Sequence, residues 1–396
     1  MAKRVYVSAF LIGVVSVALG YGAYLTAGKG TLWGITTGES KIGGHLYSLL
    51  GLPVAETKYY QQFKLAPVFS DPAQTIVIGI LLGGALPALL TGRFLIRHVP
   101  SKWMALQAVL GGLLLGYGSR LALGCNIGNF LSAWTAAGTN AITFTAALLV
   151  GTFAGLKVTE RFFLLRAVPI RFSYLPPRKL QILVGTLLIF ASVAALFTLQ
   201  PLVGLFWAAG IAFGALGSIS GICFATCYRD LVARSYASGI MVRAIGLAVL
   251  TFSTGVYLLH LLGVPFSFAT PQISQIQIAL GGFIFGVGIS LAGSCIFSSE
   301  WRAGTGSVYS AIVLLSTVFL GMPLLAVHYG WWLTVIPPVL LPSFSLYSLN
   351  PHAAYALPLA FSTALIVYGV LVDSTAKQAF SQFISTKFTS PLRLKH

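Results

Sequence analysis

Acidic residues are scarce in this sequence. Asp and Glu together number 7 in 396 residues, and charged residues of either sign make up only 8% of the chain. A soluble domain carries about 25% charged residues, so a soluble globular fold is excluded. The hydrophobic content of 57% and the mean hydropathy of +0.89 indicate an integral membrane protein.

Cysteine and histidine are also few. The chain has 4 cysteines and 6 histidines, and a disulfide framework is typical of short secreted chains. Cys223 and Cys227 are not followed by a Cys or His at the spacing of a zinc site. We therefore predict no metal site and no cofactor. Because no His or Lys base accompanies a cysteine in the sequence, we also expect a protein that is not an enzyme.

Charges are missing from long stretches of the chain. A helix needs about 20 residues to cross the hydrocarbon core, so the longest uncharged runs hold two or three spans each. We expect breaks at residues 200–201, 337–338 and 350–351. The runs lack the alternation of barrel strands. The sequence predicts an all-α polytopic membrane protein of about nine or ten transmembrane or re-entrant helices. The uncharged runs are Val5–Gly28, Pro72–Gly92, Leu121–Leu156, Leu180–Tyr228, Ala244–Ser299 and Ala303–Val372.

The net charge of +17 lies mainly between the uncharged runs, as the positive-inside rule predicts for cytoplasmic loops. We expect a first membrane half at residues 1–157, a basic cytoplasmic connector at 158–179 and a second membrane half at 180–396, with both termini in the cytoplasm. Basic residues that flank spans do not form the patch of a nucleic-acid-binding protein. A compatible second interpretation is that some of the charge draws anions toward a pore.

One glycine-rich segment occurs twice, and each copy ends in a cysteine. Residues 110–125 align without a gap on residues 280–295, with eight of sixteen positions identical, where chance gives roughly one or two. Gly-x-x-x-Gly spacing in both copies predicts closely packed helices. Such a repeat indicates two halves that build one site between them, and the relative orientation of the two copies stays open.

Cys125 and Cys295 occupy equivalent places in the repeat. A thiol is a weak donor with a polarizable sulfur, which suits a soft, sulfur-bearing ligand better than a hard anion. The alternative is that each thiol fills a packing gap. Arg120 interrupts an uncharged stretch from residue 103 to 156. A charge at membrane depth is a candidate for function, and its alternative is a side chain that snorkels to the headgroups.

Small and polar residues surround both repeat cysteines. Gly124 and Asn126 flank the first, and Ser294 precedes the second. Such residues favour a broken helix with exposed backbone N–H groups. Broken helices whose N-termini point inward are a recurrent anion-binding device of transporters.

Cys223 is a further candidate for the substrate path, and Glu39, His45 and Arg302 are secondary candidates. Cys223 follows a long apolar run, and Glu39 is one of the few acids, in the polar-interrupted segment 28–71 that we expect to be re-entrant or interfacial. Glu39 either pairs with a buried cation, senses protons or is a loop acid. His45 follows two glycines. Arg302 lies two residues after Glu300, so an ion pair is the alternative to a role in binding.

Three motifs carry a resemblance to a known family. Residues 116–126 (Gly-x-Gly-Ser-Arg-Leu-Ala-Leu-Gly-Cys-Asn), 221–230 (Gly-Ile-Cys-Phe-Ala-Thr-x-Tyr-Arg-Asp) and 286–295 (Gly-x-Gly-x-x-Leu-Ala-Gly-Ser-Cys) resemble the signatures of the YeeE/YedE sulfur-transport membrane family. Residues 30–46 and 59–64 resemble the YedE branch in particular, which is linked to selenium metabolism and formate dehydrogenase.

The resemblance implies an inner-membrane permease for thiosulfate or a related sulfur or selenium anion, which pore cysteines pass along short re-entrant helices. It assigns Cys125, Cys223 and Cys295 to the motif cysteines and implies a small TusA/SirA-like sulfur-carrier partner on the cytoplasmic side. No cysteine occurs at residues 30–39, where the first half's counterpart of Cys223 falls, and the glycine usual after the second repeat cysteine is absent.

Two alternatives to a permease stay open. One is a membrane thiol protein that accepts sulfane sulfur or selenium and delivers it to a cytoplasmic carrier. The other is a scaffold for selenoenzyme maturation.

Overall fold

The computed structural model describes residues 2–163, 173–233 and 238–388, with side chains as far as Asp373. The middle of the basic connector and the basic C-terminal side chains predicted above lie outside these limits. The longer helices are α1 (Ala2–Ala27), α2 (Thr36–Leu49), α4 (Pro72–Leu90), α5 (Lys102–Leu121), α7 (Thr139–Phe162), α8 (Arg178–Thr198), α9 (Pro201–Ser220), α10 (Phe224–Val232), α11 (Ile240–Leu261), α12 (Gln275–Ala292), α13 (Ile296–Gly304), α14 (Val308–Ser316), α15 (Met322–Val335) and α16 (Pro351–Phe388). The short elements are α3 (Lys58–Gln62), α6 (Ala133–Thr135), the 3-10 turns η1 (Val54–Glu56), η2 (Val68–Ser70) and η7 (Leu346–Ser348), and the π-helical segments η3 (Asn126–Ser132) and η6 (Thr317–Gly321). Four two-residue strands complete the set: β1 (Gly30–Thr31), β2 (Ile96–Arg97), β3 (Ser173–Tyr174) and β4 (Phe266–Ser267).

The predicted fold class is confirmed. Within the described ranges, 9 helical segments are long and apolar enough to cross a membrane, and the pair α5 with η3 and α6, bent by 50°, makes a tenth. The predicted breaks also fall between helices, because α9 and α16 begin at Pro201 and Pro351. Proline is favoured at the first position of a helix, where its missing N–H has no partner to lose.

Helices α5 and α12, which carry the two glycine-rich copies, pack backbone against backbone. A Cβ added at Gly118 would lie 2.6 Å from the backbone nitrogen of Phe285, and one at Gly281 would lie 2.6 Å from that of Ala122. Further along, Gly111 approaches Ala292 equally closely. The partner numbers fall along α12 as they rise along α5, so the two helices run antiparallel.

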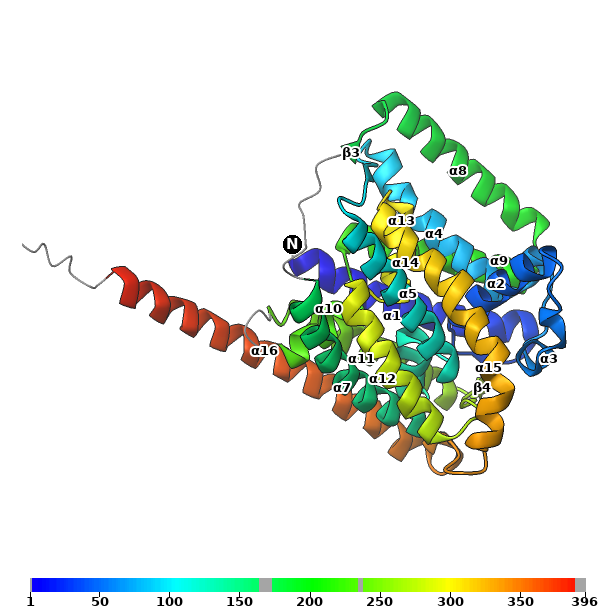
Figure 1. Cartoon of the computed structure of the whole chain (residues 1–396). Helices are drawn as coiled ribbons and strands as arrows, with labels where there is room; N and C mark the ends of the chain where they lie inside the picture. The colour runs from blue at the N-terminus through cyan, green and yellow to red at the C-terminus, as the bar shows by residue number, and fades with distance from the viewer. Residues whose placement is uncertain (1, 164–172, 234–237, 389–396) are drawn as a thin grey trace, which may run out of the picture.

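Several other close helix pairs combine the two halves of the chain, whereas α11 packs beside α16 within the second half. Helix α7 packs beside α12, and α14 with η6 packs beside α5. In the same way α1 packs beside α11, and α9 packs beside α4. The spacing of the glycine contacts shows that each of these pairs between the halves runs parallel. Helices from early and late in the chain are therefore interleaved in the bundle (Figure 1).

The bundle has two distinct faces. The N-terminal face carries the start of α1, the antiparallel β2–β3 pair and the bridge between Arg97 and Ser307. The opposite face carries the parallel β1–β4 pair and the bridge between Ser274 and Pro342. The start of α1 and the far end of α16 extend toward the same side in Figure 1, as ten crossings require.

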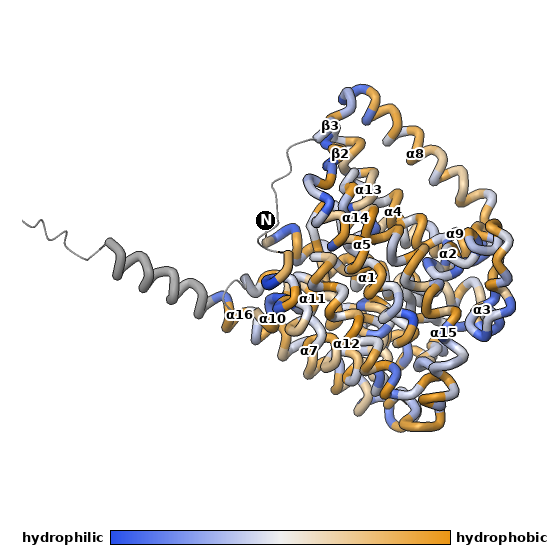
Figure 2. The backbone as a smooth tube through the Cα atoms, viewed as in Figure 1, coloured by the Kyte–Doolittle hydropathy of each residue, from blue (hydrophilic) through white to orange (hydrophobic). Residues whose placement is uncertain are grey.

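The outer surface of the bundle is apolar. In Figure 2 hydrophobic residues run along most helices, and hydrophilic ones gather at the ends, around β2, β3, α10 and α3. Phe197 on the peripheral helix α8 is 87% exposed. A phenylalanine exposed to this extent on a long apolar helix is expected where lipid, not water, surrounds the protein.

The backbone contact between α5 and α12 gives a stability prediction. Gly118→Ala places a methyl group 2.6 Å from a backbone nitrogen, and overpacking of this kind costs about 1–3 kcal/mol. Gly204→Ala in α9 is the matched control, because its new Cβ meets nothing closer than 3.7 Å. We expect a lower thermal midpoint in detergent for the first variant and an unchanged or higher one for the second. Equal midpoints would contradict the close contact.

Candidate functional site

Three cysteines occupy the same position relative to three short helices. Cys125 is the N-cap of η3, Cys223 the N-cap of α10 and Cys295 the N-cap of α13. In each case the residue two positions earlier has a left-handed backbone. These residues are Leu123 (φ 51°), Gly221 (φ 71°) and Gly293 (φ 62°). The left-handed residue ends the preceding long helix and turns the chain so that a new helix starts at the cysteine.

Gly124 is required by the first of these breaks. A Cβ at this position would lie 2.8 Å from the side chain of Asn129, which donates a hydrogen bond of 2.6 Å to the carbonyl oxygen of Ala122. The sulfur of Cys125 accepts from the backbone N–H of Ile127 at 3.5 Å. The N-terminal N–H groups of such a helix carry partial positive charge, so this sulfur lies at an electropositive point inside the bundle.

Cys223 and Cys295 meet through one hydroxyl. The thiol of Cys223 donates to Ser298 Oγ at 3.1 Å, and Cys295 Sγ lies 3.3 Å from the same oxygen. Ser298 also closes a capping box with Cys295, whose sulfur accepts from the Ser298 backbone N–H at 3.4 Å. Chain segments far apart in the sequence thus place two thiols side by side.

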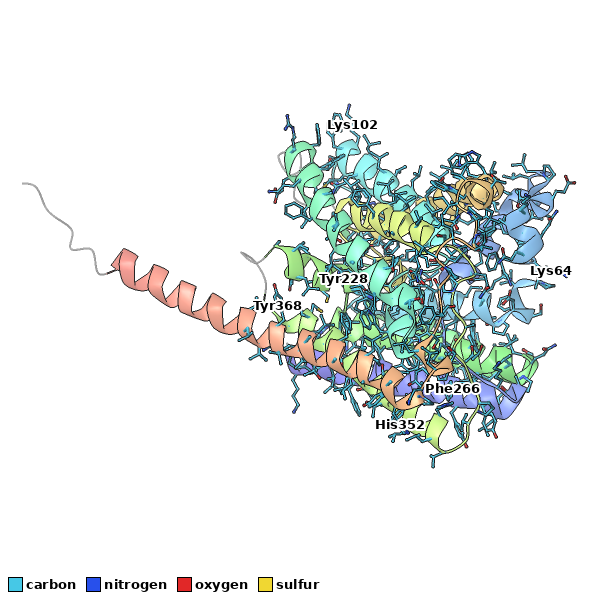
Figure 3. The ribbon with its side chains drawn as sticks, turned by 90° about the horizontal axis from the view of Figure 1, so that it is seen from below. Lys64, Lys102, Tyr228, Phe266, His352 and Tyr368 are labelled. Atoms are coloured by element: carbon cyan, nitrogen blue, oxygen red, sulfur yellow. The ribbon has the colours of Figure 1, made fainter. Side chains whose placement is uncertain are left out.

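Aromatic rings join the three short helices. The ring centroids of Phe130 and Phe224 are 6.0 Å apart, and those of Phe224 and Phe297 are 6.4 Å apart. Tyr228, fully buried, packs edge-on against Phe130 at 5.4 Å. Tyr228 lies among the helices in Figure 3, whereas Lys64 and Lys102 lie at the edges. The cysteine-capped helix starts therefore form one cluster, which we call the thiol cluster: Cys125, Cys223 and Cys295.

Arg120 is fully buried and does not snorkel. One guanidinium nitrogen donates to Thr36 Oγ1 at 2.8 Å, and the group lies over the rings of Tyr59 and Phe63 at 5.3 and 5.2 Å. Its Nε and second terminal nitrogen have no hydrogen-bond partner among the described residues. An unpaired buried cation with unused donors is costly, and an anion would satisfy it.

Asn126 and Ser294 lie beside the repeat cysteines and differ in their bonding. Both side-chain polar atoms of Asn126 are buried without a partner in the described part of the chain. Ser294 is instead engaged with Ser299 through a hydroxyl contact of 2.7 Å. The first repeat cysteine therefore has a free amide next to it, and the second does not.

The structure corrects the interpretation of the acids. Glu39 is not a loop acid, because it lies in the first turns of α2 and is fully buried. Its carboxyl group lies within hydrogen-bonding reach of that of Glu300, on α13. Glu300 forms no ion pair with Arg302 among the described residues. From the sequence we considered Glu300 only as an ion-pair partner of Arg302, although its position directly after the uncharged run that ends at Ser299 was a signal for a buried acid.

His45 lies outside the thiol cluster. Its Nε2 bonds to the carbonyl oxygen of Ala66 at 2.8 Å, which ties α2 to the segment before α4. The glycines before His45 serve packing, because a Cβ at Gly43 would lie 2.3 Å from the carbonyl oxygen of Val318.

Two cavities open at opposite faces of the bundle. The outer cavity, at the face opposite the N-terminus, has a volume of about 390 Å³ and is lined by Trp33, Thr37, Phe63, Gly128 and Asn129, among others. The basic cavity, at the N-terminal face, has a volume of about 840 Å³. Its lining includes four arginines: Arg4, Arg93, Arg97 and Arg302.

The basic cavity is where the structure places Arg302. Partial burial, together with the charge of Arg302, lowers the pKa of the Arg97 guanidinium from its usual value. Arg97 also donates to Thr305 Oγ1 at 2.7 Å. In the described part of the chain no group of three or more His, Cys, Asp or Glu residues could hold a metal ion.

Broken helices that meet inside a helical bundle are the architecture of polytopic membrane transporters. A family model described as sulphur transport matches residues 2–154 and 219–395, and the chain belongs to this family.

The chain is 28% identical over 323 residues to the probable transporter YedE of Escherichia coli (strain K12), with 76% of each chain covered. It is 29% identical over 321 residues to the probable transporter YedE of Salmonella typhimurium (strain LT2), again with 76% of each chain covered. A shorter match, 43% identical over 56 residues, covers 14% of this chain and 17% of the thiosulfate transporter TsuA of Spirochaeta thermophila. The resemblance to the YeeE/YedE family is thereby confirmed.

The shared hydroxyl of Ser298 gives a prediction about the thiols. A mild dithiol oxidant such as diamide should join Cys223 to Cys295, because both sulfurs lie next to one oxygen atom. Peptide mass spectrometry under non-reducing conditions would detect the product. Cys227→Ser is the matched control and should leave the bond unchanged, whereas Cys223→Ser should abolish it. A cross-link that uses Cys125 instead would contradict the arrangement.

Proposed function

We propose that this protein is a permease of the inner (plasma) membrane that takes up a small sulfur-containing anion, thiosulfate or a sulfur or selenium relative. The observation that carries the proposal is the fully buried guanidinium of Arg120 with two unused donor nitrogens, in the same bundle centre as the thiol cluster. The guanidinium attracts the charge of the ligand, and the thiols contact its soft sulfur. Membership of the sulphur transport family supports the substrate class.

The proposed path runs from one cavity to the other. The anion enters the outer cavity, whose lining residue Thr37 also contacts Arg120. It then passes Cys125 and the Cys223–Ser298–Cys295 group and leaves through the basic cavity, which Arg302 lines. Gly124 allows the backbone turn before Cys125, and Asn126 places its unpartnered side-chain amide next to Cys125. Transient S–H contacts replace part of the hydration shell and stay weak enough for release.

We further propose that the two halves are inverted repeats. Support comes from the antiparallel α5–α12 contact and from the matched parallel pairs α7–α12 and α14–α5. In such transporters the site lies between the repeats. Ile35, and not a cysteine, precedes α2 at the position that Cys223 holds before α10, so the pairing of thiols is incomplete in the first half.

The N-terminal face is cytoplasmic in this proposal. It carries the arginines of the basic cavity, and basic loops remain in the cytoplasm. The anion is therefore released among positive charges. A small sulfur-carrier protein of the TusA/SirA type, with an acidic surface, would receive it there.

The cysteine mechanism is tested by uptake of radiolabelled thiosulfate into cells that lack other importers. A hydrogen bond to a charged ligand is worth about 1.5 kcal/mol or more, so Cys125→Ala should lower uptake at limiting thiosulfate by about tenfold. Cys227→Ala is the matched control, because it removes another buried cysteine that is not an N-cap, and we expect near-normal uptake. Unchanged uptake in Cys125→Ala would overturn the mechanism. A persulfide trapped on Cys223 or Cys295 by alkylation would favour the thiol-carrier alternative instead.

The role of Arg120 is tested by the same assay. Arg120→Gln removes the charge and should raise the KM for thiosulfate by about tenfold to a hundredfold, since charge-assisted bonds contribute about 1.5–3 kcal/mol. Arg120→Lys keeps the positive charge but loses the planar set of guanidinium donors. Its KM for thiosulfate should therefore lie between those of the wild type and Arg120→Gln. Arg161→Gln, at the exposed end of α7, is the control. Equal KM values for the wild type and Arg120→Gln would refute a binding role.

A further inference from the structure

Two buried carboxyl groups meet where the halves of the bundle come together. Glu39 lies on α2 and Glu300 on α13, and both residues are 0% exposed. Each carboxyl is within hydrogen-bonding reach of the other. All four oxygen atoms are buried, and no N–H or O–H group in the described part of the chain donates to them.

This arrangement favours a proton bound between the two carboxyl groups. An ionised carboxylate only accepts hydrogen bonds. Two ionised carboxylates that face each other would therefore repel each other, and none of their oxygen atoms would have a donor. A single proton between them removes one charge and creates an O–H donor for the facing oxygen. Like-charged carboxylates in one site share a proton for this reason.

Among the described residues, no basic side chain forms an ion pair with either carboxyl group. The guanidinium of Arg120 acts electrostatically on Glu39, yet among the described residues the two form no ion pair. Lys41, on the same helix as Glu39, is occupied by Asp71 at 2.5 Å. The other titratable or charged groups on the elements around the pair are His45 and Tyr47 of α2, Glu56 of η1, Lys58, Tyr59 and Tyr60 of α3, Cys125 before η3, Cys223 before α10, Cys295 before α13, Arg302 of α13, Tyr309 of α14, and His328 and Tyr329 of α15.

Most of these neighbours are committed to other groups. The hydroxyl of Tyr59 bonds to Ser40 Oγ at 2.8 Å, and that of Tyr60 donates to the Ser40 carbonyl oxygen at 2.7 Å. The hydroxyl of Tyr329 donates to Gln62 at 2.9 Å. The charge at the centre of the bundle is therefore set mainly by Arg120 and the two carboxyls.

The protonation state of the pair sets the net charge at the centre of the bundle, and this charge favours or opposes anion binding. With both carboxyls ionised, their two negative charges outweigh the one positive charge of Arg120. One bound proton balances the centre, and a second leaves it positive. Both glutamates interact electrostatically with Cys125, so this change of charge is felt at the proposed anion path.

We infer that Glu39 and Glu300 form a shared proton-binding site and that the anion crosses the membrane together with a proton carried by this pair. The anion part of this inference rests on the proposed function. Entry of an anion into a cell with a negative interior opposes the membrane potential, and a proton that accompanies it offsets that cost. The pair also joins α2 of the first half to α13 of the second, so its proton lies between the two halves of the chain.

The shared proton is tested without any substrate. Infrared spectra of the purified full-length protein at neutral pH should show the C=O stretch of a protonated carboxylic acid. Glu39→Gln with Glu300→Gln should remove this band, and Glu56→Gln, an exposed acid of the same type, should keep it. A wild-type spectrum without the band would overturn the shared proton. Size-exclusion chromatography of each variant checks that it remains folded.

The coupling is tested in liposomes that contain the purified protein, with the membrane potential clamped at zero. A gradient of about one pH unit, acid outside, supports about a tenfold accumulation of thiosulfate if one proton accompanies each anion. We expect this accumulation in the wild type and in Glu56→Gln. In Glu300→Gln and Glu39→Gln we expect thiosulfate only to equilibrate, with no response to the gradient.

The outcomes separate the two proposals. Wild-type uptake that ignores the pH gradient, or full accumulation by Glu300→Gln, would overturn proton coupling and leave the permease proposal intact. No thiosulfate uptake by the wild type under any gradient would overturn the proposed substrate and the coupling with it. The infrared band would still decide whether the pair holds a proton.

Discussion

Contact between the backbones of α5 and α12 is the constraint on which the rest of the structure depends. Without side chains between them, Gly118 and Gly281 let the two helices approach until peptide groups touch. In a bilayer, where burial of apolar side chains gains little, close packing of this kind supplies much of the attraction between helices. Because the helices run antiparallel and each ends near a cysteine, the contact also fixes where the short helices begin. The thiol cluster is a consequence of that approach.

The interior of the bundle contains many polar groups in an apolar environment. Most of them form hydrogen bonds with nearby backbone or side-chain groups. The short helices are capped by thiols and hydroxyls, in agreement with the rule that irregular backbone at membrane depth must be covered by protein or line a cavity. Among the described residues, the buried polar atoms that have no hydrogen-bond partner include atoms of Arg120, Asn126, Glu39 and Glu300. These four residues are the ones on which the proposed anion and proton sites depend.

The parts of this arrangement that depend on local pattern were predictable from the sequence. The absence of charge marks the spans, and proline marks the starts of α9 and α16. The internal repeat identified Cys125 and Cys295 because a duplicated segment reveals equivalent positions directly. The contact between Glu39 and Glu300 could not be predicted, since it joins a helix near the N-terminus to one in the second half. The role of the glycines before His45 was ambiguous for a related reason: glycines before a histidine fit a ligand site and a tight helix contact equally well.

The hydroxyl of Ser298 contacts both Cys223 and Cys295, but the two contacts have different structural roles. It accepts a hydrogen bond of 3.0 Å from the backbone N–H of Cys295 and lies 3.1 Å from the carbonyl oxygen of the same residue. These bonds hold the start of α13 whether or not Cys223 also donates to the oxygen. A passing ligand can therefore take the thiol of Cys223 away from Ser298 without loosening the helix. The scaffold is fixed by the serine, and the cysteine is left free to exchange partners.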